Sequence, residues 1–321
     1  MTTAATIPVV DLADWHAGGD ARNAFIETVG KSLHEIGFLA IKQHGIDADN
    51  LGRAYELAYR FFNQADDVRL RYKPAIANGQ RGFTSFGTEH AKGNANPDLK
   101  EFWQVGRPDV PDDHPVHAKY GPNVWPDDEV PGFREAFTTL YKQMDRLGSI
   151  LLECAARHIG ESPTLFSDMS RESDTIIRVI HYPPVPDNVP EGQVRAAAHE
   201  DINLITLLPG ATADGLELLQ RDNVWMPVRA GHDTIVADSG DMLQNVTNGW
   251  YRATTHRVVN PEGEARKKPR LSMPCFIHPR KDVDLTPLPS CVKLTGGEAT
   301  YQSITAGEYL AQRLREIGLG K

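Results

Sequence analysis

The chain has 321 residues, of which 40% are hydrophobic and 24% are charged, and its formal net charge is −9 at pH 7. This composition is typical of a globular protein with a sizeable core, and no apolar run reaches the roughly 18 residues that a membrane helix needs. The acidic balance argues against a nucleic-acid partner, because phosphate binding requires clustered Lys and Arg, and the basic cluster at residues 266–270 is too short to reverse it.

The N-terminus and the cysteines predict a cytoplasmic protein with reduced thiols. Residues 1–6 have neither the positive segment nor the apolar segment of a signal peptide. Cys154, Cys275 and Cys291 are odd in number and lack C-x-x-C spacing, which argues against a disulfide framework and a thiolate zinc site. No internal repeat marks a second domain, so we expect residues 1–321 to form a single domain.

The N-terminal part of the chain alternates short strands and helices. Residues 7–12 predict a small edge strand, because a proline stands near its start. A helix is expected from Asp20, a candidate N-cap, to Gly37, a candidate C-terminal cap, and a buried strand follows at residues 38–41. A second helix with an apolar face should end near Asn63.

The character of the chain then changes twice. Gly, Pro, Asn and Asp interrupt every run between residues 74 and 131, which predicts surface loops and a candidate lid. A long amphipathic helix should run from Pro131 to Gly160, and a Thr305–Glu308 capping box predicts a C-terminal helix. Between these helices, seven strand-like runs lie at residues 175–182, 197–208, 215–219, 224–228, 234–237, 256–259 and 270–277. This density of short strands favours a barrel or a jelly roll.

Two histidines and one carboxylate are candidate metal ligands. If residues 198–208 form one strand, His199, Asp201 and Asn203 share a face. His256 lies on a later strand-like run. Two His and one carboxylate on one side of a metal leave positions open, as in non-haem Fe(II) oxygenases. Because H-x-D alone occurs often by chance, this interpretation depends on a third element.

Arg270 and Ser272 supply that third element. They are two residues apart on an apolar run and therefore share a face. A guanidinium beside a hydroxyl suits a carboxylate ligand, because the planar fork donates two parallel hydrogen bonds and the hydroxyl adds a third. The alternative interpretation of Arg270 is a solvated surface charge that continues the basic cluster.

Further motifs extend along nearly the whole chain. They are IPVVDL at 7–12, GFLAIKQHGI at 37–46, DLKE at 98–101, GDMLQ at 240–244, TNG at 247–249, HRVVNP at 256–261 and RLS at 270–272. Together they resemble the isopenicillin N synthase-like family of Fe(II)/2-oxoglutarate-dependent dioxygenases. The resemblance implies a mainly β protein with flanking helices (α+β), in which a double-stranded β-helix (jelly-roll) core follows an N-terminal helical region and precedes a C-terminal helix.

The resemblance also implies roles for the candidate residues. The metal ligands would be His199, Asp201 and His256, and the distal carboxylate of 2-oxoglutarate would be held by Arg270, Ser272 and Tyr182. Tyr182 could otherwise be a plain core aromatic. Ile180 stands where many family members have Asn, so one polar contact to 2-oxoglutarate should be missing or supplied differently. Asn203 is a candidate for orienting the metal ligands.

The implied reaction uses Fe(II) and O2 and converts 2-oxoglutarate to succinate and carbon dioxide, while a small organic molecule is oxidised, most often by hydroxylation. We expect that small molecule as the partner, without nucleic acid or membrane, and a monomer or weak homo-oligomer. Within the single dioxygenase domain, residues 1–165 would form the N-terminal helical and lid region, residues 170–290 the jelly-roll catalytic core, and residues 291–321 the C-terminal helical extension.

The substrate contacts are expected in the variable loops. The candidates are Phe83, Phe102 and Trp103, although aromatic residues in such loops pack more often than they bind ligands. Two alternative functions are a same-family Fe(II) oxidase or cyclase that does not consume 2-oxoglutarate, and a non-catalytic jelly-roll sensor of a metal or a small acid.

Overall fold

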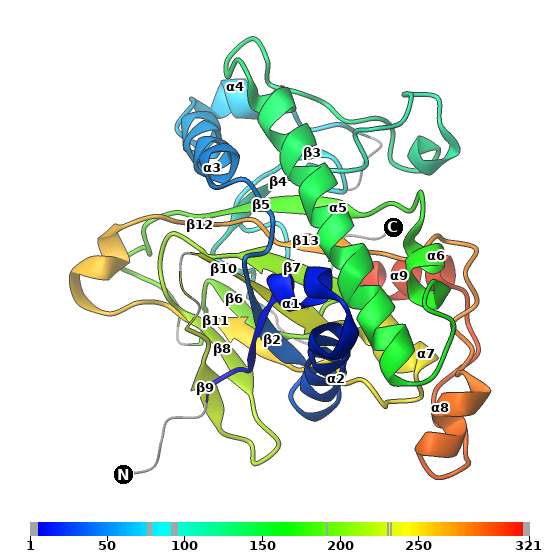
Figure 1. Ribbon diagram of the computed structural model, residues 1–321. Helices are drawn as coiled ribbons and strands as arrows, with labels where there is room; N and C mark the ends of the chain where they lie inside the picture. Colours follow the sequence, from blue (N-terminus) through cyan, green and yellow to red (C-terminus); the bar gives the residue numbers. More distant parts are fainter. Residues whose placement is uncertain are drawn as a thin grey trace.

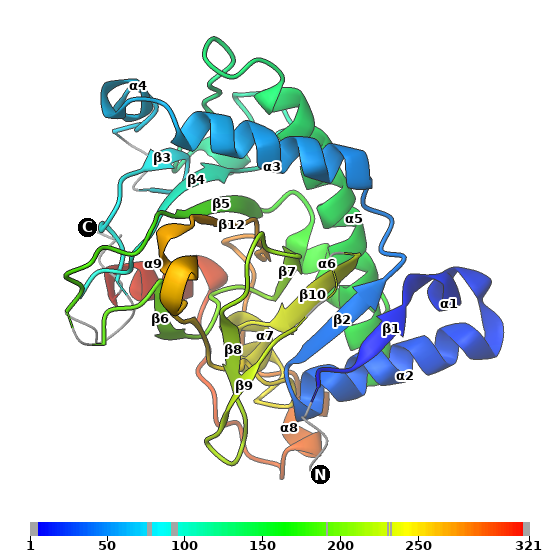
Figure 2. The same ribbon diagram turned by 90° about the vertical axis from the view of Figure 1, so that its left-hand side faces the viewer.

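The computed structural model describes residues 6–75, 79–90, 96–190, 192–229, 231 and 233–316. Two β-sheets are stacked on each other, and helices cover the outer face of the larger sheet (Figures 1 and 2). This arrangement confirms the predicted fold class, a mainly β protein with a jelly-roll core and flanking helices.

Among the described residues, the larger sheet has nine strands, in the order β1-β2-β10-β7-β13-β5-β4-β3 with β12 also paired with β5. Its strands are β1 (Val9–Asp11), β2 (Phe38–Lys42), β3 (Gly82–Thr84), β4 (Glu101–Val105), β5 (Ile176–Tyr182), β7 (Ile205–Pro209), β10 (Thr234–Ser239), β12 (Arg270–Ser272) and β13 (Cys275–Ile277). The smaller sheet has the order β6-β11-β8-β9. Its strands are β6 (Ala196–His199), β8 (Leu216–Leu219), β9 (Trp225–Pro227) and β11 (His256–Val258).

The longest helix, α5, crosses the outer face of the larger sheet, where it packs on β7 and β13 and against α2 and α3 (Figure 1). The α-helices of the described residues are α1 (Leu12–Ala17), α2 (Gly19–Glu35), α3 (Ala48–Phe62), α4 (Asp66–Leu70), α5 (Phe133–His158), α6 (Leu165–Ser170), α7 (Asp241–Val246), α8 (Pro289–Leu294) and α9 (Ala306–Glu316). The described ranges also contain two short 3-10 helices, η1 (Pro115–His117) and η2 (Gly263–Lys267). Helices α3, α5 and α9 confirm the helices predicted from apolar periodicity and from the capping box.

Alternation along the strands divides the core of the larger sheet between its two faces. In β2, Leu39 and Ile41 join the cluster that packs under the helices, whereas Phe38 and Ala40 pack against Leu218 of the smaller sheet. Since both faces of β2 are buried, residues 38–41 are apolar on both sides of this strand. The inner face of the larger sheet therefore forms one wall of the space between the sheets.

The N-terminal region differs from the prediction in two ways. Helix α2 begins at Gly19, one residue before the predicted N-cap, and the separate helix α1 precedes it. Helix α2 ends as predicted, because Gly37 has a φ of 78° and a Cβ there would lie 2.5 Å from the carbonyl oxygen of Arg252. Residues 74–131 are not only loops and a lid, since β3 and β4 lie within them and belong to the larger sheet.

Two of the predicted strands are each split in the structure. The run at 197–208 forms β6 and β7, which lie in different sheets, and the residues between them form a turn. The prediction that His199, Asp201 and Asn203 share one strand face is therefore wrong. The run at 270–277 is split into β12 and β13, and Pro274 lies at the break because it has no N–H to donate to a ladder.

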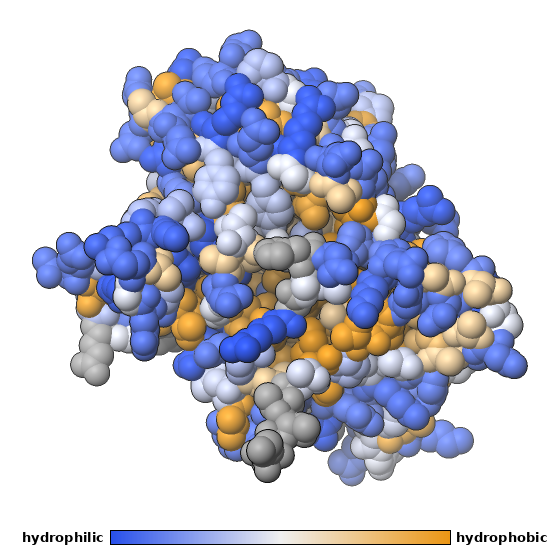
Figure 3. Space-filling model, turned by 60° about the vertical axis from the view of Figure 1, so that its left-hand side comes forward, coloured by the Kyte–Doolittle hydropathy of each residue, from blue (hydrophilic) through white to orange (hydrophobic). Residues whose placement is uncertain are grey.

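The surface carries many hydrophilic side chains (Figure 3), as expected for a chain with 24% charged residues. On the face shown in Figure 3, hydrophilic side chains cover the periphery, and apolar side chains gather toward the middle. Among the described residues, none of the helices combines the length and the apolarity that a membrane crossing requires.

Candidate active site

A cavity of about 380 Å³ lies between the two sheets, and helix α9 contributes to its wall. Six residues that the sequence singled out line it together: His199, Asp201, His256, Arg270, Ser272 and Tyr182. The cavity therefore brings the candidate metal ligands and the candidate carboxylate receptor into one space.

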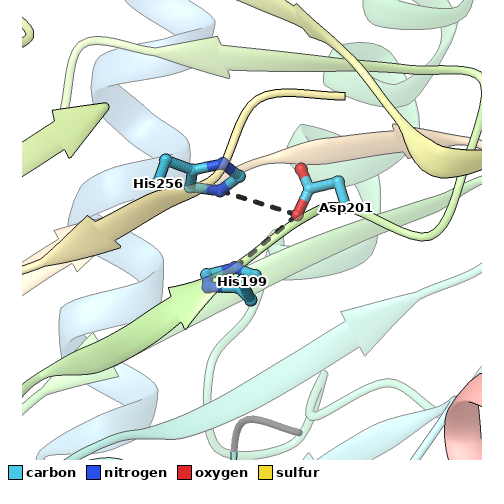
Figure 4. A group of neighbouring side chains, drawn as sticks. All are labelled: His199, Asp201 and His256. Carbon is cyan, nitrogen blue, oxygen red and sulfur yellow. Dashed lines mark ion pairs between the residues drawn. The ribbon is translucent and has the colours of Figure 1, made fainter. Parts of the chain in front are cut away.

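His199 and His256 face each other on neighbouring strands. They are register partners on β6 and β11, and their ring centroids lie 4.4 Å apart. Asp201 lies in the turn after β6, and its Oδ1 is 3.7 Å from Nε2 of each histidine (Figure 4). The three candidate ligand atoms all lie within 4.8 Å of one another. A single cation therefore fits among them.

Hydrogen bonds to the backbone fix which ring nitrogen of each histidine faces the candidate cation position. Nδ1 of His199 lies 2.7 Å from the carbonyl oxygen of Ala197, and Nδ1 of His256 lies 3.1 Å from that of Thr254. Because a carbonyl oxygen only accepts, Nδ1 carries the proton in both rings and Nε2 keeps a lone pair. Burial and the neighbouring His199 lower the pKa of His256, which favours the neutral imidazole that ligates metals.

Hydrogen bonds orient the Asp201 carboxylate. The Thr206 hydroxyl donates to its Oδ2, and Nδ2 of Asn203 donates to the Thr206 hydroxyl at 2.8 Å. The backbone of the turn is also held, since the N–H of Asp241 donates to the carbonyl oxygen of Asp201 at 2.8 Å. Asn203 thus helps to position Asp201, but it acts from a turn and not from a shared strand face.

Arg270 and Ser272 lie on β12, where Arg270 is the register partner of Tyr182 on β5. Arg270 is only 2% exposed, so the alternative of a solvated surface charge is wrong. Its Nε donates to the carbonyl oxygen of Ala213 at 2.9 Å, whereas its buried Nη1 has no hydrogen-bond partner among the described residues. A buried guanidinium with an unused donor fits a carboxylate ligand.

The wall around this receptor is apolar at Ile180. Ile180 is the register partner of Ser272, and it packs in a cluster with Phe102, Tyr182 and Val258. Ile180 has no polar side-chain atom, so it donates no hydrogen bond to a bound carboxylate.

The three aromatic residues expected to contact substrate lie on strands β3 and β4. Trp103 is completely buried, and its ring lies 4.6 Å from that of Phe61 in the core under the helices. Phe83 belongs to the same core. Phe102 lies on the other face of β4, in the small cluster that borders the cavity. None of the three is among the described residues that line the cavity itself.

Several polar residues that the sequence did not assign to the site also line the cavity. Lys100, from the DLKE motif, makes ion pairs with Glu89 and Asp98, and Arg178 reaches Glu89 from β5. Arg313 of α9 makes an ion pair of 2.9 Å with Asp241. Lys100, Glu89 and Asp98 are near one another in the chain, whereas Arg178 and Arg313 meet their partners from distant segments, so sequence spacing carried no signal for those two contacts.

Comparisons with known proteins place the chain among oxygenases. The family model described as non-haem dioxygenase in morphine synthesis N-terminal matches residues 7–128, and that of the 2OG-Fe(II) oxygenase superfamily matches residues 173–279. The 2-oxoglutarate-dependent dioxygenase thnC of Trichoderma harzianum is 30% identical over 81% of this chain and 82% of its own length. Validamycin A dioxygenase of Streptomyces hygroscopicus subsp. limoneus is 28% identical over 96% of this chain and 86% of its own.

Solved structures give the same result. A 2OG-Fe(II) oxygenase family protein from Caulobacter crescentus has a TM-score of 0.86 and 36% identity, over 98% of this chain and 99% of its own. A full-length Neurospora crassa protein, solved in complex with alpha-KG and thymine, has a TM-score of 0.84 and 26% identity, over 96% of both chains.

Fold and cavity together define a class, the non-haem iron enzymes built on a double-stranded β-helix. Within that class, the chain belongs to the 2-oxoglutarate-Fe(II) oxygenase superfamily, to which the isopenicillin N synthase-like resemblance pointed. It is an oxidoreductase that uses Fe(II), 2-oxoglutarate and O2 and acts on a small molecule.

Proposed function

We propose that the chain hydroxylates a small organic molecule, with Fe(II) held by His199, Asp201 and His256. The distal carboxylate of 2-oxoglutarate is bound by Arg270, Ser272 and Tyr182. The unpartnered Nη1 of Arg270, in the cavity that also holds the three candidate ligands, is the observation that carries this proposal. When bound, Fe(II) and 2-oxoglutarate supply the activation of O2, coupled to the formation of succinate and carbon dioxide.

The protein's own contribution is to hold and orient. Both histidines offer Nε2 lone pairs because their Nδ1 protons are engaged by backbone carbonyls. Asp201 offers Oδ1 because Thr206 occupies Oδ2. Apolar side chains line part of the cavity and exclude water there. They are Phe38, Ile176, Ile180, Ile202, Leu208, Leu216, Val258 and Phe276.

The cavity volume of about 380 Å³ supports a substrate of small-molecule size. The complexes of the Neurospora crassa relative with thymine and with 5-formyluracil give the same indication. The division of the domain at residues 165 and 291, the cytoplasmic location and the monomeric or weakly associated state stay predictions.

The test is succinate formation from 2-oxoglutarate with Fe(II) and O2. We expect slow turnover without a substrate, and we expect His199→Ala and Asp201→Ala to abolish it together with anaerobic Fe(II) binding. Normal turnover in either variant would show that the ligand assignment is wrong. The exposed Arg221 provides a control, since Arg221→Ala removes only a hydrogen bond to the carbonyl oxygen of His34.

A second variant tests the carboxylate receptor. Truncating one partner of a buried charge pair costs about 2 to 5 kcal/mol, so Arg270→Ala should raise the 2-oxoglutarate concentration for half-maximal turnover roughly 30-fold or more. Anaerobic Fe(II) binding should stay unchanged. An unchanged 2-oxoglutarate requirement would contradict the receptor and favour the oxidase that does not consume 2-oxoglutarate.

A further inference from the structure

The cavity contains a buried network of charges that neither the metal site nor the 2-oxoglutarate receptor uses. Nζ of Lys100 lies 2.6 Å from Oε1 of Glu89 and 2.8 Å from Oδ2 of Asp98. Nη1 of Arg178 lies 3.0 Å from Oε2 of Glu89. The four side chains are between 4% and 13% exposed. Two positive and two negative charges thus balance one another inside the wall of the cavity.

Burying these four charges is unfavourable for the free energy of folding. Removing four charges from water carries a desolvation penalty that attraction between them offsets only with good geometry. Although burial opposes its ionisation, Arg178 and Lys100 lower the pKa of Glu89 to about 2, so the carboxylate stays charged at neutral pH. A well-packed apolar wall would serve stability equally well. The network therefore points to a role in the cavity.

The network is tied to the strand that carries the first metal ligand. Oδ1 of Asp98 accepts a hydrogen bond of 3.0 Å from the N–H of Ala197, two residues before His199. On the other side, the guanidinium of Arg178 lies over the rings of Phe102 and Phe276, at 4.5 Å and 5.3 Å from their centroids. A group bound to this network is thus held at a fixed position relative to the metal site.

Hydrogen-bonding capacity remains unused beside the network. Within the part of the chain that the structure describes, Nε of Arg178 and Nε2 of Gln80 are buried donors without a partner, and Oε1 of Gln104 is a buried acceptor without a partner. Gln104 is the register partner of Arg178 across β4 and β5. Nδ1 of His278 also has no partner in the described ranges, and burial lowers the pKa of this imidazole to about 4, so the ring is neutral. All four residues line the cavity.

We propose that this wall, formed by Glu89, Asp98, Lys100 and Arg178 with Gln80 and Gln104, binds an uncharged amide-like group of the substrate, such as a carboxamide, a lactam or a cyclic imide. The inference rests on the proposed function and names its substrate class. The carbonyl of such a group accepts from Arg178 and Gln80, and its N–H donates to Gln104.

The balance of charge favours an uncharged group over an ionic one. A carboxylate would lie beside Glu89, and an ammonium would lie beside Lys100, so each would meet a like charge in a poorly hydrated space. An amide satisfies both the unpaired donors and the unpaired acceptor without adding charge. The site thus discriminates against the acid that corresponds to each amide.

The test compares matched ligands on the protein loaded with 2-oxoglutarate and with Zn(II) in place of Fe(II), so that no turnover occurs. The pairs are nicotinamide with nicotinate and 2-piperidone with 5-aminopentanoate, and binding is followed by ligand-observed NMR. We expect each amide to bind about tenfold more tightly than its ionic partner, because the unpaired polar atoms are then satisfied. Equal or tighter binding of the ionic partners, or no binding of either amide, overturns the proposal.

Variants of the wall test whether the amides bind to these residues. Arg178→Met keeps an unbranched apolar stem but removes the guanidinium donors, and Gln104→Met removes the acceptor. Each should weaken amide binding at least several-fold and leave 2-oxoglutarate binding unchanged. Unchanged amide affinity in both variants overturns the proposal.

The two proposals fail in different ways. If succinate forms slowly with Fe(II) and O2 but amides have no advantage, only the substrate class is wrong. If the protein forms no succinate under any condition, the proposed function itself fails. Succinate release that amides accelerate, and that their ionic partners do not, supports both.

Discussion

The hydroxyl of Thr206 offers a sharp test of how the metal site is built. It donates to Oδ2 of Asp201 and accepts from Nδ2 of Asn203, and the residue is only 2% exposed. Replacing Thr206 by Val keeps the shape of the side chain and removes the hydroxyl. The carboxylate then loses its donor, and the Asn203 amide loses its acceptor.

The expected effect follows from the charge of the acceptor. A hydrogen bond to a charged group contributes about 1.5 to 3 kcal/mol, which corresponds to roughly a 10- to 150-fold change in an equilibrium constant. Loss of a partner that orients a metal ligand typically weakens metal binding by about 10- to 100-fold. We therefore expect Thr206→Val to weaken anaerobic Fe(II) binding by about 10- to 100-fold.

The assay is anaerobic calorimetric titration of the metal-free protein with Fe(II). Thr206→Ser, which keeps the hydroxyl, is the matched control and should bind Fe(II) nearly as tightly as the native protein. Unfolding temperature should be measured for both variants, so that a folding defect is recognised. Native affinity in a folded Thr206→Val variant would refute the idea that this hydrogen bond holds Asp201 in place.

Three further predictions follow from packing and burial. A Cβ at Gly240 would lie 2.5 Å from the carbonyl oxygen of Asn203, so Gly240→Ala should displace the turn that carries Asp201 and weaken Fe(II) binding in the same titration. Trp103→Ala should lower the free energy of unfolding in urea by about 3 to 5 kcal/mol while the folded protein binds 2-oxoglutarate normally, because Trp103 packs in the core. The pKa of His278 is lowered from 6.5 to about 4, so the unfolded chain takes up this proton first. Above pH 6.5 the free energy of unfolding contains the full contribution of the neutral imidazole, and this contribution is lost as the pH falls to about 4. His278→Asn should therefore reduce the change in the free energy of unfolding over this pH range by up to about 3 kcal/mol.

Local patterns predicted the helices well. The apolar stripe of the predicted helix at 131–160 is the buried face of α5, and the Thr305–Glu308 capping box closes in the structure with reciprocal hydrogen bonds. Both signals depend on residues within a few positions of one another. The strand at residues 101–105 was missed because every residue of β4 is buried, so the run shows no alternation.

Asp201 lies beside the two histidines, as the H-x-D pattern suggested, but through a geometry other than the predicted one. H-x-D suggested a shared strand face, but the chain leaves the smaller sheet after His199 and turns into the larger one. The turn is held by backbone hydrogen bonds from Asp241 and Met242, about 40 residues further along the chain. Nothing within residues 198–208 reveals those partners. For the same reason, the meeting of Glu89 with Arg178 could not be predicted from spacing.

The three candidate ligands also join different layers of the molecule. His199 and His256 belong to the smaller sheet, whereas Asp201 lies on the turn that enters the larger one. A cation among them is thus a cross-link between two sheets, and its binding energy becomes part of the cohesion of the sandwich. A free metal concentration 100 times the dissociation constant adds about 2.7 kcal/mol to the folded state. Iron shortage would then lower the amount of this protein as well as its activity, since the metal-free form unfolds more often and is more readily degraded.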